Sequence, residues 1–254
     1  MKRVLTYVIS IAALLFAWEM ASLTVNAINH VLILPGPFNA LSQVVKNAAE
    51  LQRNFAASAW RLILAIFISL ATAMPLGLII GRESTLDRYF SPIIYITYPI
   101  PQVALILFLF VVFGTGSATK VAMVTFALFF QILVSARGAA KNIDEEYITS
   151  VLSAGATRWQ VYWHVVLPAT LPQILTSLRV SIGLGIAFLY IAETRAALGT
   201  GLGSFINKHM LFSRDKAFAG IIAMAVLGLL LYIAVDVIER IVCRWKYVEK
   251  RPLK

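Results

Sequence analysis

Long apolar runs separated by short polar stretches give the chain its main pattern. Six runs are long enough for a membrane-spanning helix, because about 20 apolar residues cross the roughly 30 Å hydrocarbon core of a bilayer. The runs are continuous rather than alternating, which argues against a transmembrane barrel and leaves helices as the spanning structure. The predicted spans cover residues 4–25, 57–80, 90–113, 118–135, 171–191 and 217–238.

The polar segments between the runs differ in kind. Residues 26–56 contain Leu34-Pro35-Gly36-Pro37 and then apolar residues at helical spacing, which predicts a short amphipathic helix on the outer face. Residues 192–216 are glycine-rich and predict a bent outer connection, whereas residues 136–170 form the one long loop on the opposite side. Lys2-Arg3 before the first run could mark a signal peptide, but the run is long and we expect an uncleaved anchor.

Composition and charge support this picture. Of 254 residues, 60% are hydrophobic and 13% charged, against about 25% charged in soluble domains. The net charge is +10, and 13 Lys and Arg residues lie on the side that holds the N-terminus, 7 on the other, with Arg61 and Arg179 inside spans. Cytoplasmic loops collect such residues. We therefore predict an all-α, multi-pass inner-membrane protein with cytoplasmic termini and one transmembrane domain, residues 1–254, without nucleic acid as a partner.

The 136–170 loop has an internal pattern of its own. Acidic residues 144–146 favour a helix N-terminus, Gly155 interrupts the helix, and a second amphipathic stretch exposes Trp159 and Trp163. Leu167-Pro168 is then expected to open the fifth span, because proline at the first helical position loses no hydrogen bond. This predicts a helix–glycine–helix projection, for which a purely structural loop cap is the simplest alternative.

Gly155, nine residues, and then Val165-Val166-Leu167-Pro168 resemble the cytoplasmic EAA loop of permeases of binding-protein-dependent ABC importers. That motif runs Glu-Ala-Ala, three residues, Gly, nine residues, Ile-x-Leu-Pro. The chain departs from it at the triplet, which is Thr149-Ser150-Val151. Fragments such as Pro99-Ile100-Pro101 and Gly201-Leu202-Gly203 extend the resemblance to the nitrate/sulfonate/taurine branch over about residues 30–245.

The resemblance implies a type I importer fold and a set of partners. Two permease copies, expected to be a homodimer, would form the pathway, with two cytoplasmic ATP-binding subunits below and a solute-binding protein outside. This chain would be no enzyme and carry no cofactor, since ATP and Mg²⁺ would bind the partner ATPase. The residues implied to contact the ATPase through a coupling helix are Thr149, Ser150, Gly155, Ala156, Arg158, Trp159, Leu167 and Pro168.

The resemblance also bounds the solute. A small anion such as a sulfonate, taurine or nitrate is expected, with a vitamin-precursor heterocycle as the alternative.

Ionisable residues inside spans usually mark a functional site or an ion pair. We hypothesise that Arg61 pairs with Glu193 or Glu19 and that Arg179 faces the bundle interior. The alternative is that these residues form structural ion pairs or extend their charged ends to the membrane surface. Pro99 and Pro101 predict a bend beside the solute path, or else a fixed kink. Candidate path or gate residues are Pro99, Pro101, Arg61, Arg179 and Glu193.

Motifs for other chemistry are missing from the sequence. The segment nearest to a phosphate-binding loop, residues 114–120, has Thr119 where glycine is required. Three scattered histidines and the single Cys243, which we expect to be inert, argue against a metal site. A self-contained carrier or channel would typically show repeats or several buried acids, and a membrane enzyme would need paired acids or a nucleophile and base at one depth. Neither set is evident.

Overall fold

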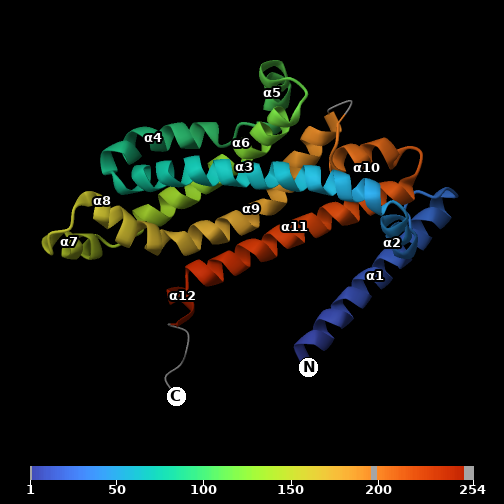
Figure 1. Cartoon of the computed structure of the whole chain (residues 1–254), viewed down its shortest axis with the longest axis horizontal. Helices are drawn as coiled ribbons and strands as arrows, with labels where there is room; N and C mark the ends of the chain where they lie inside the picture. The colour runs from blue at the N-terminus through green and yellow to red at the C-terminus, as the bar shows by residue number, and fades with distance from the viewer. Residues whose placement is uncertain (1, 196–198, 249–254) are drawn as a thin grey trace. The chain divides into compact units, whose positions relative to one another are not determined.

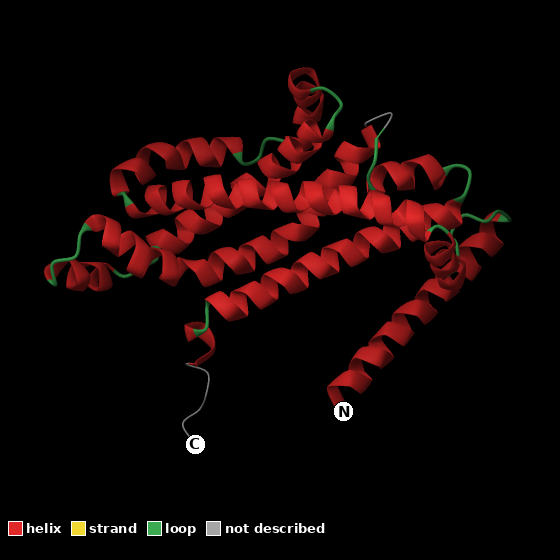
Figure 2. Ribbon diagram, viewed as in Figure 1, coloured by secondary structure: helices red, strands yellow, loops and turns green. Residues whose placement is uncertain are grey.

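The computed structural model describes residues 2–195 and 199–248. Every regular element in these residues is a helix (Figures 1 and 2). The chain forms two compact units, the first made of Met1–Ser58 and Glu193–Leu227 and the second of Ala59–Ala192 and Gly228–Lys254. Lys250, Arg251 and Lys254, which contribute to the predicted cytoplasmic charge, lie outside the described residues.

Five helical stretches among the described residues are long and apolar enough to cross a membrane. A bent helix pair brings the number to six if it counts as one span, so the predicted set of apolar spans is confirmed. The single helices are α1 (Lys2–Asn29), α3 (Ala48–Arg82), α6 (Ser117–Lys141), the run Arg158–Arg195 and α11 (Arg214–Val242).

The third predicted span, residues 90–113, is not one straight helix. α4 (Ser84–Thr97) and the run of η1 (Gln102–Leu105) and α5 (Ile106–Phe113) meet at 80° (Figure 1). Pro99 and Pro101 lie in the break, where proline removes backbone donors and disfavours helical geometry in the preceding residue. The predicted bend is therefore present, although Pro92 lies inside α4 without ending it.

Glycines allow close helix packing in the second unit. A Cβ on Gly77 of α3 would lie 2.7 Å from the Cβ of Ala136 in α6, and one on Gly81 would overlap the Arg137 carbonyl. The small-residue face at Gly77 and Gly81 thus brings the α3 and α6 backbones together, as such faces do in membrane helices. Gly228 of α11 similarly lies against Ile186 of α9 (Leu167–Arg195).

The first unit contains the predicted short helix, α2 (Pro37–Lys46), together with α10 (Leu202–Met210). The chain before α2 is held to α1 by side-chain hydrogen bonds. The Asn26 side-chain oxygen accepts from the backbone N–H of Ile33 at 2.7 Å, and the Trp18 indole N–H donates to the Pro35 carbonyl at 3.0 Å. These bonds fix the turn that leads into α2.

Candidate functional site

The loop after α6 folds as two short helices joined at Gly155. α7 (Glu145–Ser153) carries two glutamates in its first turn, where carboxylates interact favourably with the helix dipole. It ends in a Schellman motif, in which the N–H of Gly155 donates to the Leu152 carbonyl and that of Ala156 to the Val151 carbonyl. Gly155 has a φ of +90°, which glycine adopts without steric cost.

The second helix, α8 (Arg158–Val161), begins at a capping box. The Thr157 hydroxyl accepts from the Gln160 backbone N–H at 3.3 Å, and the Gln160 side-chain oxygen accepts from the Thr157 N–H at 2.8 Å. The Thr-x-x-Gln spacing, residues 157–160, is the sequence signature from which this cap could have been predicted. Local hydrogen bonds therefore hold the 145–168 segment on both sides of Gly155, at the end of α7 and at the start of α8.

α9 begins at Leu167, as predicted for Leu167-Pro168, but it continues from α8 without a break. One helical run extends from Arg158 to Arg195 and includes a π-helical turn, Tyr162–Val166. There the Leu167 N–H donates to the Tyr162 carbonyl, five residues earlier. Pro168 has no N–H and its ring crowds the carbonyl four residues before it, which accounts for a widened turn at this point.

The 145–168 segment presents an exposed surface. Thr149, Ser150, Gly155 and Arg158 are exposed, as is 70% of Trp159. The remaining residues predicted for this surface, Ala156, Leu167 and Pro168, are partly buried.

Two ion pairs connect this segment to the turn between α3 and α4. An Arg82 guanidinium nitrogen lies 2.5 Å from a Glu145 carboxylate oxygen, and Arg158 lies 4.0 Å from Glu83. Because each pair has at least one well-exposed member, each contributes up to about 1 kcal/mol. The pairs therefore orient the segment on α3 more than they stabilise it.

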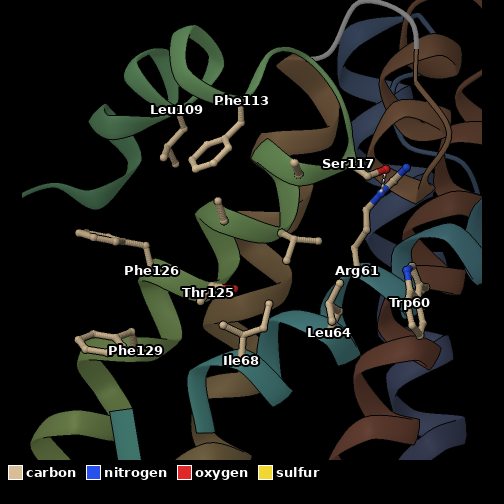
Figure 3. Close-up of a pocket in the computed structure, with 13 residues that line it drawn as sticks. Trp60, Arg61, Leu64, Ile68, Leu109, Phe113, Ser117, Thr125, Phe126 and Phe129 are labelled. Carbon is tan, nitrogen blue, oxygen red and sulfur yellow. Dashed lines mark hydrogen bonds between the residues drawn. The ribbon is translucent and has the colours of Figure 1, made fainter. Parts of the chain in front are cut away.

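A cavity of about 640 Å³ lies beside Arg61 in the second unit. Figure 3 shows the Arg61 side chain bonded to Ser117, whose hydroxyl accepts from Nε at 3.2 Å. Arg61 is 5% exposed and is the one charged residue among the described residues that line the cavity. The other lining residues are Trp60, Leu64, Ile68, Leu109, Phe113, Ser117, Ala118, Val121, Ala122, Thr125, Phe126 and Phe129.

The bend at Pro99 and Pro101 positions part of this cavity wall. The η1–α5 run follows the two prolines directly, and its residues Leu109 and Phe113 line the cavity. Thr125 also lines the cavity (Figure 3), but its hydroxyl oxygen is buried and has no hydrogen-bond partner in the described part of the chain. Neither Pro99 nor Pro101 lines the cavity itself; the two prolines precede the helical run that does.

Arg179 lies in a different environment. Its guanidinium contacts Asp236 at 2.9 Å and Glu239, and Glu239 also binds Lys246 at 2.6 Å. Glu239 is 1% exposed, so this network joins α9 to α11 and α12 (Trp245–Val248) inside the unit. Arg179 is absent from the set that lines the Arg61 cavity, and the geometry favours the structural ion-pair alternative.

Glu193 organises the start of α10 in the first unit. Its carboxylate, fully buried, accepts from the Ser58 hydroxyl at 2.9 Å and from the Gly203 N–H at 2.8 Å. The Gly201 N–H donates to the Asn54 side-chain oxygen at 2.8 Å, and no Cβ would fit at Gly201 beside the Glu193 carboxylate. Pairing of Arg61 with Glu193 or Glu19 stays a prediction.

Three basic residues assigned to loops from the sequence belong to α6 instead, and two of them, Lys120 and Arg137, are buried. Lys120, counted with the outer loops, is 2% exposed within α6. Arg137 and Lys141, counted with the 136–170 loop, also belong to α6 and bind Asp87 of α4 at 2.5 and 2.6 Å. The apolar run ends near residue 135, but the helix continues because these side chains find a partner.

Comparisons with known proteins identify relatives over most of the chain. It is 32% identical over 244 residues to the taurine transport system permease protein TauC of Escherichia coli, which covers 93% of this chain and 88% of TauC. It is 28% identical over 239 residues to the formylaminopyrimidine transport permease protein ThiX of Halalkalibacterium halodurans, covering 92% of each.

A solved structure shares the fold. The inward-facing MetNI methionine ABC transporter matches with a TM-score of 0.66 at 19% identity, covering 77% of this chain and 97% of that chain. The model of the family described as "Binding-protein-dependent transport system inner membrane component" matches residues 73–242, more than half of the chain. The chain therefore belongs to this family and is a multi-pass inner-membrane permease of an ABC importer rather than an enzyme.

Proposed function

We propose that this permease moves a small organic anion of the taurine or sulfonate type, which an external binding protein delivers. The observation that carries the solute class is the 32% identity to TauC over 93% of the chain. The Arg61 cavity supports an anion, because a guanidinium can donate two parallel hydrogen bonds to the oxygens of a sulfonate. Nitrate satisfies the same chemistry.

A vitamin-precursor heterocycle is the second candidate. ThiX, 28% identical over 92% of the chain, is a formylaminopyrimidine permease by its name. Aromatic side chains in the cavity wall, among them Trp60, Phe113 and Phe126, can stack on a flat ring. The charge of Arg61 favours the anion.

The 145–168 segment is proposed to couple transport to ATP hydrolysis in a separate subunit. ATP and Mg²⁺ would bind that subunit, and its closure would act on the exposed residues Thr149, Ser150, Arg158 and Trp159. A coupling element must make different contacts in the inward- and outward-open states, because only differential contacts shift such an equilibrium. The Schellman motif and the capping box support this role, because their local hydrogen bonds stiffen the segment.

The proposed assembly contains two copies of this permease, two ATP-binding subunits and one external binding protein. Cytoplasmic placement of residues 145–168 follows from the excess of Lys and Arg on that side. Pro99, Pro101 and Arg61 are proposed for the solute path, because they position or line one cavity.

Uptake into proteoliposomes tests this function. The permease, its ATP-binding subunit and its binding protein are reconstituted together, and labelled taurine uptake is measured with competing sulfonates, nitrate or formylaminopyrimidine. We expect ATP-dependent uptake that sulfonates compete for and that Arg61→Gln reduces more than Arg61→Lys. Uptake by the permease alone would instead indicate a secondary carrier, and competition by formylaminopyrimidine alone would indicate the heterocycle.

A further inference from the structure

A second cavity, of about 380 Å³, lies between the C-terminal part of α3 and the 145–168 segment. Its volume falls within the range of about 300–1,000 Å³ that is usual for small-molecule sites. The wall is almost wholly apolar. Its main contributors are Met74, Leu78 and Ile79 from α3, with Trp159, Trp163 and Leu167 from the opposite side.

Two tryptophans stand at the edge of this cavity. The rings of Trp159 and Trp163 pack edge to face with centroids 5.6 Å apart, and the residues are 70% and 51% exposed. Ile79, on the facing wall, is 43% exposed. Tryptophan is enriched at the level of the lipid headgroups, where one edge of the ring meets water and the rest meets acyl chains. The cavity lies near the ends of two helical runs that are long and apolar enough to cross a membrane, a position suited to contact with lipid headgroups.

Polar groups gather at one end of the cavity. Tyr162 and Glu83 line it, and Arg158, which does not itself line the cavity, is paired with Glu83. Arg82 is engaged by Glu145, whereas 86% of the Arg158 side chain is exposed and its pair with Glu83 is long, at 4.0 Å. Arg158 can therefore donate to an additional anionic oxygen without breaking a close pair.

We propose that this cavity binds one acyl chain of a membrane phospholipid, with the lipid phosphate on Arg158. The apolar wall takes the chain, the tryptophans mark the headgroup level, and the guanidinium supplies the complementary charge for a phosphate. A bound lipid would lie against the segment that is proposed to contact the ATPase. The assignment of this lipid to the cytoplasmic leaflet rests on the proposed function, whereas the proposal that the cavity binds a lipid does not.

Photo-crosslinking of the full-length permease in lipid vesicles tests the proposal. Two probes carry the same diazirine-bearing acyl chain: a phosphatidylglycerol and a diacylglycerol that lacks phosphate. Adducts are mapped by mass spectrometry to the peptides that hold residues 74–79 and 159–167. We expect phosphatidylglycerol to label both peptides, and Arg158→Gln to lower its labelling about tenfold, the scale of a charge-assisted hydrogen bond, while leaving diacylglycerol labelling unchanged.

Cavity-filling variants separate this site from general contact with lipid. Ile79→Trp or Met74→Trp should lower labelling by both probes several-fold. Leu76→Trp is the matched control, because Leu76 is 47% exposed on the same helix and does not line the cavity; its labelling should stay at the wild-type level. Equal labelling in Ile79→Trp, Met74→Trp and Leu76→Trp would overturn the proposal, as would equal sensitivity of both probes to Arg158→Gln.

A final experiment tests whether the cavity is occupied by lipid or by the ATP-binding subunit. Arg158 and Trp159 are also among the residues proposed to meet the ATPase, so this experiment follows the peptide that holds residues 74–79. Its labelling should persist when the ATP-binding subunit is added, and its loss would assign the cavity to the protein interface instead. The readout needs neither ATP nor solute, so failure of transport coupling leaves it intact. The side of the membrane is tested by adding the probe only to the outside of right-side-out vesicles. Labelling under these conditions would place the 145–168 segment on the outer side, and the lipid site itself would still stand.

Discussion

The Glu193 carboxylate shows how one residue can hold a whole connection in place. It is fully buried and accepts hydrogen bonds from Ser58 and Gly203, while the Leu202 N–H donates to the Ser58 hydroxyl at 2.8 Å. The first N–H groups of α10 are thereby satisfied, as a helix N-terminus requires. Glu193 is thus a positioning residue for the α9–α10 connection.

Glu193→Gln should destabilise the protein by about 1–3 kcal/mol, because an amide NH₂ would face the Gly203 or Ser58 donor and leave a buried group unpaired. Thermal unfolding in detergent measures the effect. Glu50→Gln is the control: Glu50 pairs with Lys208 at 3.3 Å near the surface, so its loss should cost at most about 1 kcal/mol. Equal melting temperatures for both variants would contradict the assigned role.

Cys243 should react slowly with thiol reagents. It is fully buried, and burial raises the pKa of its thiol above the ordinary value despite the opposing charge of Lys246. A raised pKa leaves less thiolate at any pH below it, and the thiolate is the reactive form. Maleimide labelling at pH 7.5 should therefore be more than tenfold slower in the folded protein than after unfolding in detergent; comparable rates would show that the thiol is accessible.

At the scale of elements, close packing of α3 on α6 depends on glycine. Gly81→Ala should cost about 1–3 kcal/mol, the usual range for overpacking, because the new Cβ would overlap the Arg137 carbonyl, which is backbone and cannot move aside. Gly138→Ala on α6 is the matched control, since a Cβ there meets nothing within 4 Å and alanine favours a helix by about 1 kcal/mol. Melting temperatures that shift in opposite directions would bear this out, and a neutral Gly81→Ala would refute it.

The elements differ in how far a single sequence reveals them. Apolar runs, the bend at Pro99 and Pro101 and the break at Gly155 were predictable because each depends on local composition. The π-turn before Pro168 was not, because a missing N–H can be accommodated by a helix start or by a wider turn. The partners in the buried polar contacts lie far apart in the sequence. Ser58 and Glu193 are separated by 135 residues, and Arg179 and Glu239 by 60. Such pairings depend on tertiary packing that hydropathy does not encode.

On the scale of the whole molecule, the lever role proposed for the 145–168 segment requires that the segment stay rigid between the ATPase and the spans. Local bonds supply that rigidity: the Schellman motif ends α7, the capping box begins α8, and Arg82 ties Glu145 to the end of α3. Ile148 and Val161 are buried, at 6% and 5% exposure, and anchor the two short helices. Gly155, between them, is where this rigidity is most easily tested.

Gly155→Ala should weaken coupling between ATP hydrolysis and uptake. The φ of +90° costs an L-residue about 1–2 kcal/mol, and since a Cβ at this position meets nothing within 4 Å, the cost is in the backbone alone. α7 would then relax out of its Schellman geometry, and the solute moved per ATP hydrolysed should fall several-fold in the reconstituted complex. Gly155→Asn should recover most of the ratio, because asparagine tolerates the left-handed region better than alanine. An alanine variant that keeps the wild-type ratio would mean that the segment transmits no motion through this turn, whereas failure of both variants to assemble with the ATP-binding subunit would place the effect of Gly155 in docking rather than in transmission.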